Sequence, residues 1–484
     1  MTLIEQFKAA RRAGCPLIAI HTADPAATMR NINASLNGKA GPIVQWDTVR
    51  GITAVNESGK AVVSGISGAS NVISAVAALV AAESVQEETI FYMHQMHRVI
   101  AEPGVSQAVW NLRDQFKVTQ RTLVMLCPSM EIPVELQQDV LVLDEPLPTL
   151  DQLQEVVKDI YKSAGLDVPD NVDKATDAIC GLAAFPAEQA CAMSIGKAGI
   201  NLPNLWERKR RAVEETPGLS IHRGKETFDD IGGCANVKEY FTALLNGREP
   251  YRAIVFVDEI EKQLAGVGSD SSGVSSEGHG ILLTWMQEHR ASGSIFLGPP
   301  GAAKSALAKA IGNMGGLLTI TLDIGATKSS LVGESGARLR SALKVIESVS
   351  QGRALFIATC NSIDSLSPEL RRRFKSGTFF FDLPQAEERA MIWAIYQSKY
   401  SLDQQERPND RDWTGAEIET CCETAWRLNI PLVQAANYIV PVAQSDAQRI
   451  KMLRQQADGK FISASNPGPY QFEQVSQLGR KLAI

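Results

Sequence analysis

The sequence has no apolar run close to the ~20 residues that a membrane-spanning helix requires, and we therefore expect no membrane association. Its N-terminal stretch, "MTLIEQFKAARRAG", has neither a long apolar block nor a small-residue cleavage site, which argues against a secretory signal. Positive charge is not in excess either. The formal net charge of −6 disfavours a generally basic nucleic-acid binder.

Cysteine is scarce and has no regular spacing. Only Cys421 and Cys422 are neighbours among the eight cysteines. Neither a metal site nor a disulfide framework has this pattern, so we expect reduced, mostly buried thiols in a cytoplasmic protein. The zinc-protease motif HExxH is also absent, which excludes a built-in protease of that class.

The chain does contain an alternation of strand-like and helical patterns. Apolar runs at 16–22, 89–94 and 122–127 are separated by helical stretches, an order that favours a parallel sheet covered by helices. A chain of 484 residues is also too long for one core. We therefore expect an α/β domain (1–150), a helical subdomain (151–205), a linker (206–228), a second α/β domain (229–384) and a helical lid with a C-terminal tail (385–484).

Two stretches, 123–148 and 355–384, follow the same order of elements. Each runs from a strand through a short polar turn and a proline near Glu-Leu to a second strand, Leu-Pro and a helix. This match predicts a tandem duplication of one α/β-plus-lid module. A partial chance match between two unrelated parallel-sheet domains is the alternative.

The stretch "SIFLGPPGAAKSALAKAIG" (294–312) has the order of a phosphate-binding loop: a strand, a Gly/Pro loop, Lys-Ser and a helix. In such a loop, backbone N–H groups and the helix N-terminus face the phosphates of ATP. Lys304 would contact the outer phosphates and Ser305 would bind Mg²⁺. A helix cap made by Gly and Pro is the alternative. The expected nucleotide-binding residues are Gly298, Pro299, Pro300, Gly301, Ala302, Ala303, Lys304, Ser305 and Ala306.

Ala303 stands where a phosphate loop usually has glycine. If this position requires a positive φ, alanine costs ~1 kcal/mol there, a strain that the loop can tolerate.

The run "IVFVDE" (254–259) predicts a buried strand that delivers Asp258 and Glu259 to the metal-bound phosphates. Asp258 would lie in the outer ligand sphere of Mg²⁺, and Glu259 would orient and deprotonate the attacking water. An ordinary strand ending in solvated acids is one alternative. The run at 317–323 is another, because it follows the phosphate loop, but it ends in a single Asp.

The acidic pair precedes the phosphate loop in the chain, whereas in nucleotide-hydrolysing proteins it normally follows. In a parallel sheet all strands end at one edge, so a strand with its return helix can move along the chain and keep its position in the sheet. We therefore expect a permuted core, with 276–289 as the return helix of this strand.

Two further elements indicate a ring-forming ATPase. Asn361 ends the strand-like run 355–361 and is placed to hold the attacking water or the γ-phosphate. Arg371, Arg372 and Arg373 follow, and one or two of them can reach the γ-phosphate of a neighbouring subunit; a surface cluster is the alternative. The segment 331–333 is expected to be either a loop facing a central pore or a simple helix entry.

Together these motifs resemble the AAA+ ATPase superfamily. They are "FDDIGG" (228–233), "GPPGAAKS" as Walker A, "VFVDE" as Walker B, "ATCN" as sensor 1, "RRRF" as arginine fingers and "TGAEIE" (414–419) as the start of the lid helix. The chain resembles in particular the "hypothetical chloroplast reading frame" AAA proteins of plastids and cyanobacteria, in "DEIEK" (258–262) and "TWMQE" (284–288). Walker B before Walker A departs from the superfamily.

The resemblance implies an α/β fold. A parallel-sheet P-loop core with a helical lid would follow a degenerate, P-loop-less AAA-like domain. In that first domain, His94 and Gln95 replace the acidic pair, and Gln137, Gln138 and Asp139 replace the arginines. Such a domain cannot organise Mg²⁺ or stabilise a γ-phosphate, so we expect it to dock partners or ring neighbours.

The first functional hypothesis is a Mg²⁺-dependent ATPase that assembles as a homo-oligomeric ring, expected to be a hexamer, and remodels a protein or nucleoprotein partner. The second is a nucleotide-binding scaffold or switch with little hydrolysis. The third is a DNA-directed ATPase, against which the acidic balance and the lack of an added DNA-binding motif count.

Overall fold

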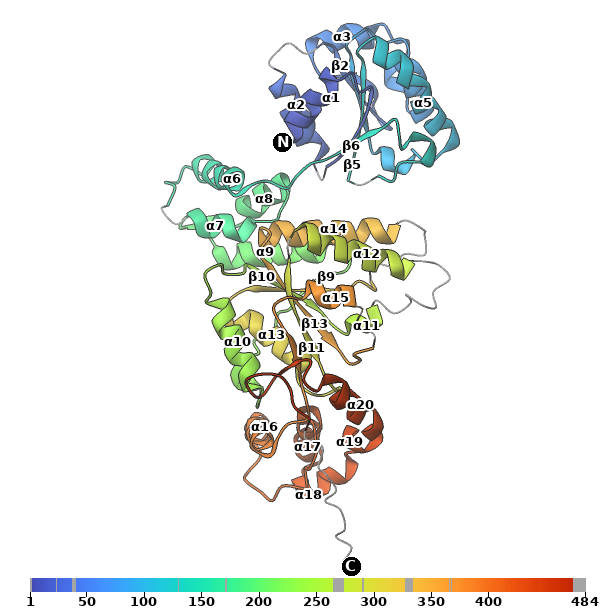
Figure 1. The fold of residues 1–484 in the computed structure, drawn as a ribbon. Helices are drawn as coiled ribbons and strands as arrows, with labels where there is room; N and C mark the ends of the chain where they lie inside the picture. Colours follow the sequence, from blue (N-terminus) through green and yellow to red (C-terminus); the bar gives the residue numbers. More distant parts are fainter. Residues whose placement is uncertain are drawn as a thin grey trace, which may run out of the picture. The chain divides into compact units, whose positions relative to one another are not determined.

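The computed structural model describes residues 2–22, 24–36, 41–128, 130–169, 172–263, 274–289, 291–326, 334–364, 366 and 368–472. The chain forms two compact units, Met1–Trp206 and Glu207–Ile484 (Figure 1). The division falls within helix α9 (Leu202–Glu214). Among the described residues, none of the helices has both the length and the apolar character needed to cross a membrane.

The first unit contains a six-stranded sheet of order β3-β2-β4-β5-β1-β6. All neighbours are parallel except β2 and β3. The bounds are β1 (Leu17–His21), β2 (Ile43–Asp47), β3 (Gly51–Ala54), β4 (Ile90–His94), β5 (Thr122–Cys127) and β6 (Leu141–Asp144). Every residue of β5 is buried, as expected for a central parallel strand covered on both faces.

Helices cover both faces of this sheet (Figure 1). They are α1 (Leu3–Arg12), α2 (Pro25–Ser35), α3 (Glu57–Ser64), α4 (Ala75–Ala82) and α5 (Pro103–Val118). Successive residues of β1 alternate between two cores: Leu17 packs with the α4 and α5 side, and Ile18 packs with the α1 and α2 side. The expected helical segment 151–205 contains α6 (Leu150–Ser163), α7 (Val172–Ile179) and α8 (Ala184–Ala192), followed by a short pair of strands, β7 (Ile195–Gly196) and β8 (Gly199–Ile200).

The second unit contains a seven-stranded sheet of order β15-β14-β11-β13-β10-β12-β9, in which only the β12–β9 pair is antiparallel. The bounds are β9 (Leu219–Ile221), β10 (Ala253–Val257), β11 (Ser292–Leu297), β12 (Leu318–Leu322), β13 (Ala354–Cys360), β14 (Thr378–Phe380) and β15 (Ile462–Ser463). The α/β class expected from the sequence is confirmed, with mostly parallel sheets.

Two layers of helices enclose this sheet. One face packs on α10 (Ala235–Leu245) and α13 (Lys304–Met314), and the other packs on α12 (Val274–Glu288) and α14 (Glu334–Ser350). The short helices α11 (Ile260–Gln263) and α15 (Pro368–Arg373) follow β10 and precede β14. Helix α12 connects β10 to β11, as expected for the return helix. The expected pore loop 331–333 lies outside the described residues.

The two sheets have the same succession of neighbours. The first unit runs β6-β1-β5-β4-β2-β3 and the second, apart from the additional edge strand β15 beside β14, runs β14-β11-β13-β10-β12-β9, each ending in an antiparallel strand. The order along the chain differs. Strand β11 has the position of β1, and β10 has the position of β4. In the first unit β1 precedes β4, whereas in the second unit β10 precedes β11. The shared succession supports one module used twice, with its strands connected differently.

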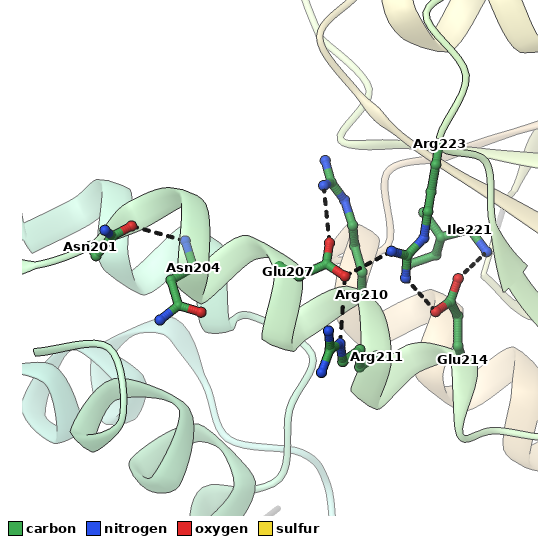
Figure 2. Close-up of polar contacts among 8 residues, drawn as sticks. All are labelled: Asn201, Asn204, Glu207, Arg210, Arg211, Glu214, Ile221 and Arg223. Carbon is green, nitrogen blue, oxygen red and sulfur yellow. Dashed lines mark hydrogen bonds and ion pairs between the residues drawn. The ribbon is translucent and has the colours of Figure 1, made fainter.

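The segment 206–228 is not the linker that its charged composition suggested. It contains the end of α9 and strand β9, which pairs with β12 at the edge of the sheet. Leu219 and Ile221 are buried in that core. Arg223 donates hydrogen bonds to Glu207 and Glu214 of α9, both at 2.7 Å (Figure 2). Strand β9 has only three residues, which are too few for an alternating strand pattern to be recognised in the sequence.

The C-terminal region has two roles. Helices α16 (Ala386–Lys399), α17 (Gly415–Leu428) and α18 (Leu432–Ala435) form a lid with its own core around Trp393 and Trp413. Beyond α19 (Val442–Ser445), helix α20 (Ala447–Ala457) and β15 return to the sheet. Asp382, just after β14, accepts hydrogen bonds from Arg454 Nε at 2.8 Å and from Tyr470 Oη at 2.6 Å. What was expected as a tail therefore includes part of the core up to residue 472, and 473–484 lie outside the described residues.

Tyr470 is only 7% exposed, and replacing it by Phe removes its hydrogen bond to Asp382 and keeps the ring. We expect Tyr470→Phe to lower the free energy of unfolding of the second unit by about 1–2 kcal/mol, because the half-buried Asp382 carboxylate loses one of its two hydrogen-bond donors and keeps only Arg454. Tyr438 is 69% exposed and provides the control; Tyr438→Phe should change stability by less than ~0.5 kcal/mol. Denaturant titration measures both. Equal stability of the two variants would contradict a stabilising role for the returning segment.

Candidate functional site

Three parallel strands of the second unit, β10, β11 and β13, end at one edge of the sheet and open onto a cavity of about 330 Å³. The acidic pair after β10, the loop after β11 and Asn361 after β13 all line it. On the opposite side it is closed by the segment before α10 and by the lid. The lining residues are Asp230, Ile231, Gly232, Asp258, Glu259, Pro300, Gly301, Ala302, Ala303, Lys304, Ser305, Ala306, Thr359, Asn361, Ile392, Tyr396, Gly415, Ala416 and Glu419.

The loop after β11 requires small residues and positive φ angles. A Cβ on Gly298 would lie 2.1 Å from the carbonyl oxygen of Phe381. Gly301 has φ 79° and lies beside Thr414 of the lid. Ala303 has φ 60°, so the left-handed conformation considered from the sequence is present in an alanine. This strain costs about 1–2 kcal/mol, which the surrounding contacts must offset.

Helix α13 begins at Lys304, and none of the described side chains caps its first turn. Lys304 is 6% exposed, and its Nζ donates hydrogen bonds to the carbonyl oxygens of Gly298 at 2.9 Å and Pro299 at 2.7 Å. Burial lowers the pKa of Lys304 to about 8, although nearby carboxylates, foremost that of Glu261, act in the opposite direction. A buried cation beside an uncapped helix N-terminus is suited to bind an anion.

The two motifs that are separated in the chain meet at this edge. Ser305 Oγ donates a hydrogen bond to Asp258 Oδ1 at 2.8 Å. A hydroxyl and a carboxylate are the hard oxygen donors that Mg²⁺ prefers, and phosphate oxygens commonly complete its octahedron. The residues present therefore fit a Mg²⁺ ion held between Ser305, Asp258 and the phosphates of a nucleotide.

Glu259 and Asn361 are in direct contact. Glu259 Oε1 accepts a hydrogen bond from Asn361 Nδ2 at 3.1 Å, and Glu259 Oε2 pairs with Lys262 Nζ at 2.7 Å. Glu261 Oε1 accepts the backbone N–H of Asn361 at 2.9 Å. The sequence indicates Lys262 and Glu261 only as part of "DEIEK". The contact between Glu261 and Asn361 joins residues 100 positions apart, so only the fold reveals it.

Asp323, the alternative acid in the usual chain order, is not among the cavity-lining residues. It follows β12, which lies beyond β10 in the sheet, and its Oδ1 accepts the backbone N–H of Ala326 at 3.0 Å. The acidic pair after β10 is therefore the one that the fold brings to the loop.

The three arginines do not line the cavity of their own chain. Arg371 and Arg372 are exposed on α15, whereas Arg373 is partly buried and donates a hydrogen bond to Gln287 of α12. Gln287 belongs to the "TWMQE" stretch, which thereby supports the end of the arginine helix. The exposed pair is free of this internal contact.

The wall of the cavity away from the loop combines apolar and polar side chains. Ile231, Ile392 and the ring of Tyr396 form an apolar surface that suits a flat aromatic group. Glu419 pairs with Lys399 at 2.7 Å, and burial followed by the nearby Glu419 raises the pKa of Tyr396. The sequence indicated this wall only through "FDDIGG" and "TGAEIE".

The corresponding edge of the first unit has opposite electrostatic character. Helix α2, which follows β1, is capped by Asp24, whose Oδ1 accepts the N–H of Ala27 at 2.9 Å. Thr28 in the same turn donates to Glu145 Oε2 at 2.6 Å. At the end of β4, His94 Nε2 lies 3.1 Å from Gln45 Oε1, and burial lowers the pKa of His94. Carboxylates already occupy the end of the helix that would face an anion.

Comparison with known proteins agrees with this geometry. Residues 3–145 match the family described as "SpoVK-like AAA ATPase, N-terminal domain". The chain is also similar to proteins named "Uncharacterized AAA domain-containing protein ycf46". The one from Guillardia theta is 22% identical, over 96% of this chain and 97% of that protein. The one from Gracilaria tenuistipitata var. liui is 24% identical, over 78% of this chain and 83% of that protein. The one from Trieres chinensis is 23% identical, over 94% of this chain and 97% of that protein. The first unit therefore resembles the N-terminal domain of SpoVK-like AAA ATPases, and the chain is similar along most of its length to the ycf46 AAA domain-containing proteins.

Proposed function

We propose that the second unit binds ATP with Mg²⁺ and hydrolyses it. The observation that carries this proposal is the 2.8 Å hydrogen bond between Ser305 Oγ and Asp258 Oδ1, two residues 47 positions apart in the chain. It joins the phosphate-loop helix to the strand that carries the acidic pair. Without this contact, the two motifs would be unrelated features of one sheet.

Each residue has a role that follows from its place. Lys304 and the N–H groups at the start of α13 would hold the phosphates, Ser305 would bind Mg²⁺, and Asp258 would hold the metal from its outer ligand sphere. The metal, when bound, neutralises charge that develops on the phosphate oxygens. Glu259 takes a proton from the attacking water, and Asn361 keeps the Glu259 carboxylate directed into the cavity.

The same proposal includes a re-ordered core. The supporting observation is that β10 occupies the position of β4 in a sheet with the same neighbours, although it precedes the phosphate-loop strand in the chain. All of these strands end at one edge, so only the connections between them need to change. The acidic pair therefore keeps its position relative to the loop.

A nucleotide-binding scaffold or switch with little hydrolysis is the second candidate. One observation favours it: the Glu259 carboxylate is held on one side by Lys262 and on the other by Asn361. A carboxylate held in this way must release one of these contacts before it can take a proton from water. The Lys262 side chain is 68% exposed, however, so solvent screens the pair and its rupture costs little.

Assembly and partners belong to the same proposal. The position of Arg371, Arg372 and Arg373 outside their own cavity suits contact with a neighbouring subunit in a ring, for which we propose a hexamer. We further propose that the ring acts in the cytoplasm, where the eight cysteines remain free thiols, and remodels a protein or nucleoprotein partner docked on the first unit.

Glu259→Gln removes the proposed base and keeps the size and hydrogen-bonding capacity of the side chain. We expect ATP binding to persist and turnover to fall by ~10²-fold or more. Phosphate release and calorimetric binding measure the two properties. Glu57, whose side chain is 87% exposed in the first unit, provides the control Glu57→Gln, which should match the parent. Equal turnover of Glu259→Gln and the parent would remove Glu259 from this role and favour the scaffold.

The pKa of Lys304, lowered to about 8, predicts a pH dependence of binding. Lys304 is charged at pH 7 and mostly neutral at pH 9 in the free protein, and a bound triphosphate favours the charged form. We therefore expect the affinity for ATP to fall about tenfold between pH 7 and pH 9. Calorimetry on Glu259→Gln measures this. Lys262→Ala should keep the pH dependence, and an affinity that is constant over this range would contradict the assignment to Lys304.

Mixing two inactive variants tests whether an arginine acts across a subunit boundary. One variant carries Glu259→Gln, and the other carries Arg371→Ala together with Arg372→Ala. We expect each to be inactive alone and the mixture to regain a substantial part of the parent turnover, because the doubly substituted subunit keeps its base and receives arginines from its neighbour. Steady-state hydrolysis at a concentration that supports assembly measures this. No recovery in mixed assemblies would contradict the proposed contact in trans.

A further inference from the structure

A buried hydroxyl group lies between the two acidic residues of the site. Thr359, on β13 two positions before Asn361, is 1% exposed. Its Oγ1 donates a hydrogen bond to Asp258 Oδ1 at 2.5 Å and accepts the backbone N–H of Glu259 at 2.8 Å. One side chain thus contacts both residues to which we assign metal binding and proton transfer.

The contact to the Glu259 N–H acts on the backbone. Glu259 has φ 46°, a left-handed conformation that non-glycine residues rarely adopt. The backbone pairing of β10 with β13 ends at Val257 and Ala358. Beyond this pair, the backbone N–H of Glu259 is bound by the Thr359 side chain. The hydroxyl therefore stabilises the turn that directs the Glu259 carboxylate into the cavity.

The contact to Asp258 acts on the carboxylate. Asp258 Oδ1 accepts hydrogen bonds from both Ser305 Oγ and Thr359 Oγ1. An O–H donor to a carboxylate at this distance is a strong, charge-assisted bond. Two donors, one on helix α13 and one on strand β13, fix the rotation of the carboxylate, and this orientation is what a bound metal requires.

The first unit provides an internal comparison. There, His94 pairs with Leu126 on β5, at the position that Thr359 has on β13. Gln95 has the same left-handed conformation as Glu259, with φ 54°, but its N–H bonds to the carbonyl oxygen of Leu126 at 2.9 Å. The threonine hydroxyl thus occurs in the unit that has the acidic pair, whereas the unit without this pair has leucine.

We propose that Thr359 is a positioning residue that orients Asp258 and Glu259 for Mg²⁺-dependent hydrolysis, an inference that rests on the proposed function. It predicts that loss of the hydroxyl impairs metal use and turnover rather than nucleotide affinity as such. Valine has nearly the same shape as threonine, so Thr359→Val isolates the hydroxyl. Serine retains it and should restore the function.

Two readouts test the proposal. In Thr359→Val we expect kcat to fall ~10-fold or more with KM changed less than threefold, as for the loss of a hydrogen bond to a charged group. Independently of turnover, the Mg²⁺ concentration that gives half-maximal binding of a fluorescent ATP analogue should rise ~10-fold or more, whereas binding without Mg²⁺ should stay unchanged. Thr359→Ser should remain within about threefold of the parent in both measurements.

Thr319 on β12 provides a matched control. It is 2% exposed, and its Oγ1 has no hydrogen-bond partner among the described residues. Thr319→Val should leave both readouts at the parent values. If Thr359→Val does not fold, Thr359→Ala carries the same expectation, and a thermal melt establishes that each variant is folded.

The possible failures are distinguishable. A folded Thr359→Val or Thr359→Ala with the parent kcat and Mg²⁺ requirement overturns this inference and leaves the proposed function intact. Equal losses in Thr319→Val and Thr359→Val would indicate general destabilisation and also overturn it. A folded parent chain that shows neither Mg²⁺-dependent ATP binding nor hydrolysis overturns the proposed function, and this inference with it.

Discussion

The hydrogen bond between Ser305 and Asp258 depends on one property of the sheet: its parallel strands end at the same edge. Strand β13 lies between β10 and β11, so the contact spans the end of β13. Thr359 on that strand completes the bridge, because its hydroxyl also bonds to Asp258. The turn after β10, the helix after β11 and strand β13, which are far apart in the chain, thereby meet at one carboxylate.

The two units show that a small local difference within one fold can determine the chemistry of a site. Apart from the additional edge strand β15, both sheets have the same succession of neighbours, and both have a left-handed residue after the strand that occupies the position of β10. They differ at the helix that follows β1 or β11. Asp24 caps α2 with a negative charge, whereas α13 begins with buried Lys304 and no side-chain cap. The sign of the charge at one helix end decides which unit suits a triphosphate.

Local patterns revealed much of the site. The strand with four apolar residues before Asp258, the loop before Lys304 and the strand before Asn361 all have the predicted type and direction. Even the positive φ considered at Ala303 is present. The failures involve short or distant elements. Strand β9 has three residues, β15 has two, and the bond from Tyr470 to Asp382 joins residues 88 positions apart. Such pairings leave no periodic signal.

The sequence by itself determined which chemical groups are available: a lysine and a serine at the start of a helix, two acids after a buried strand and an amide after another. Only the tertiary structure decided that these groups share one cavity, that Asp323 does not, and that Thr359 and Glu261 support them. The physical reason is that local residue spacing sets chain direction and burial, whereas the order of strands in a sheet results from packing between residues on the order of 100 positions apart.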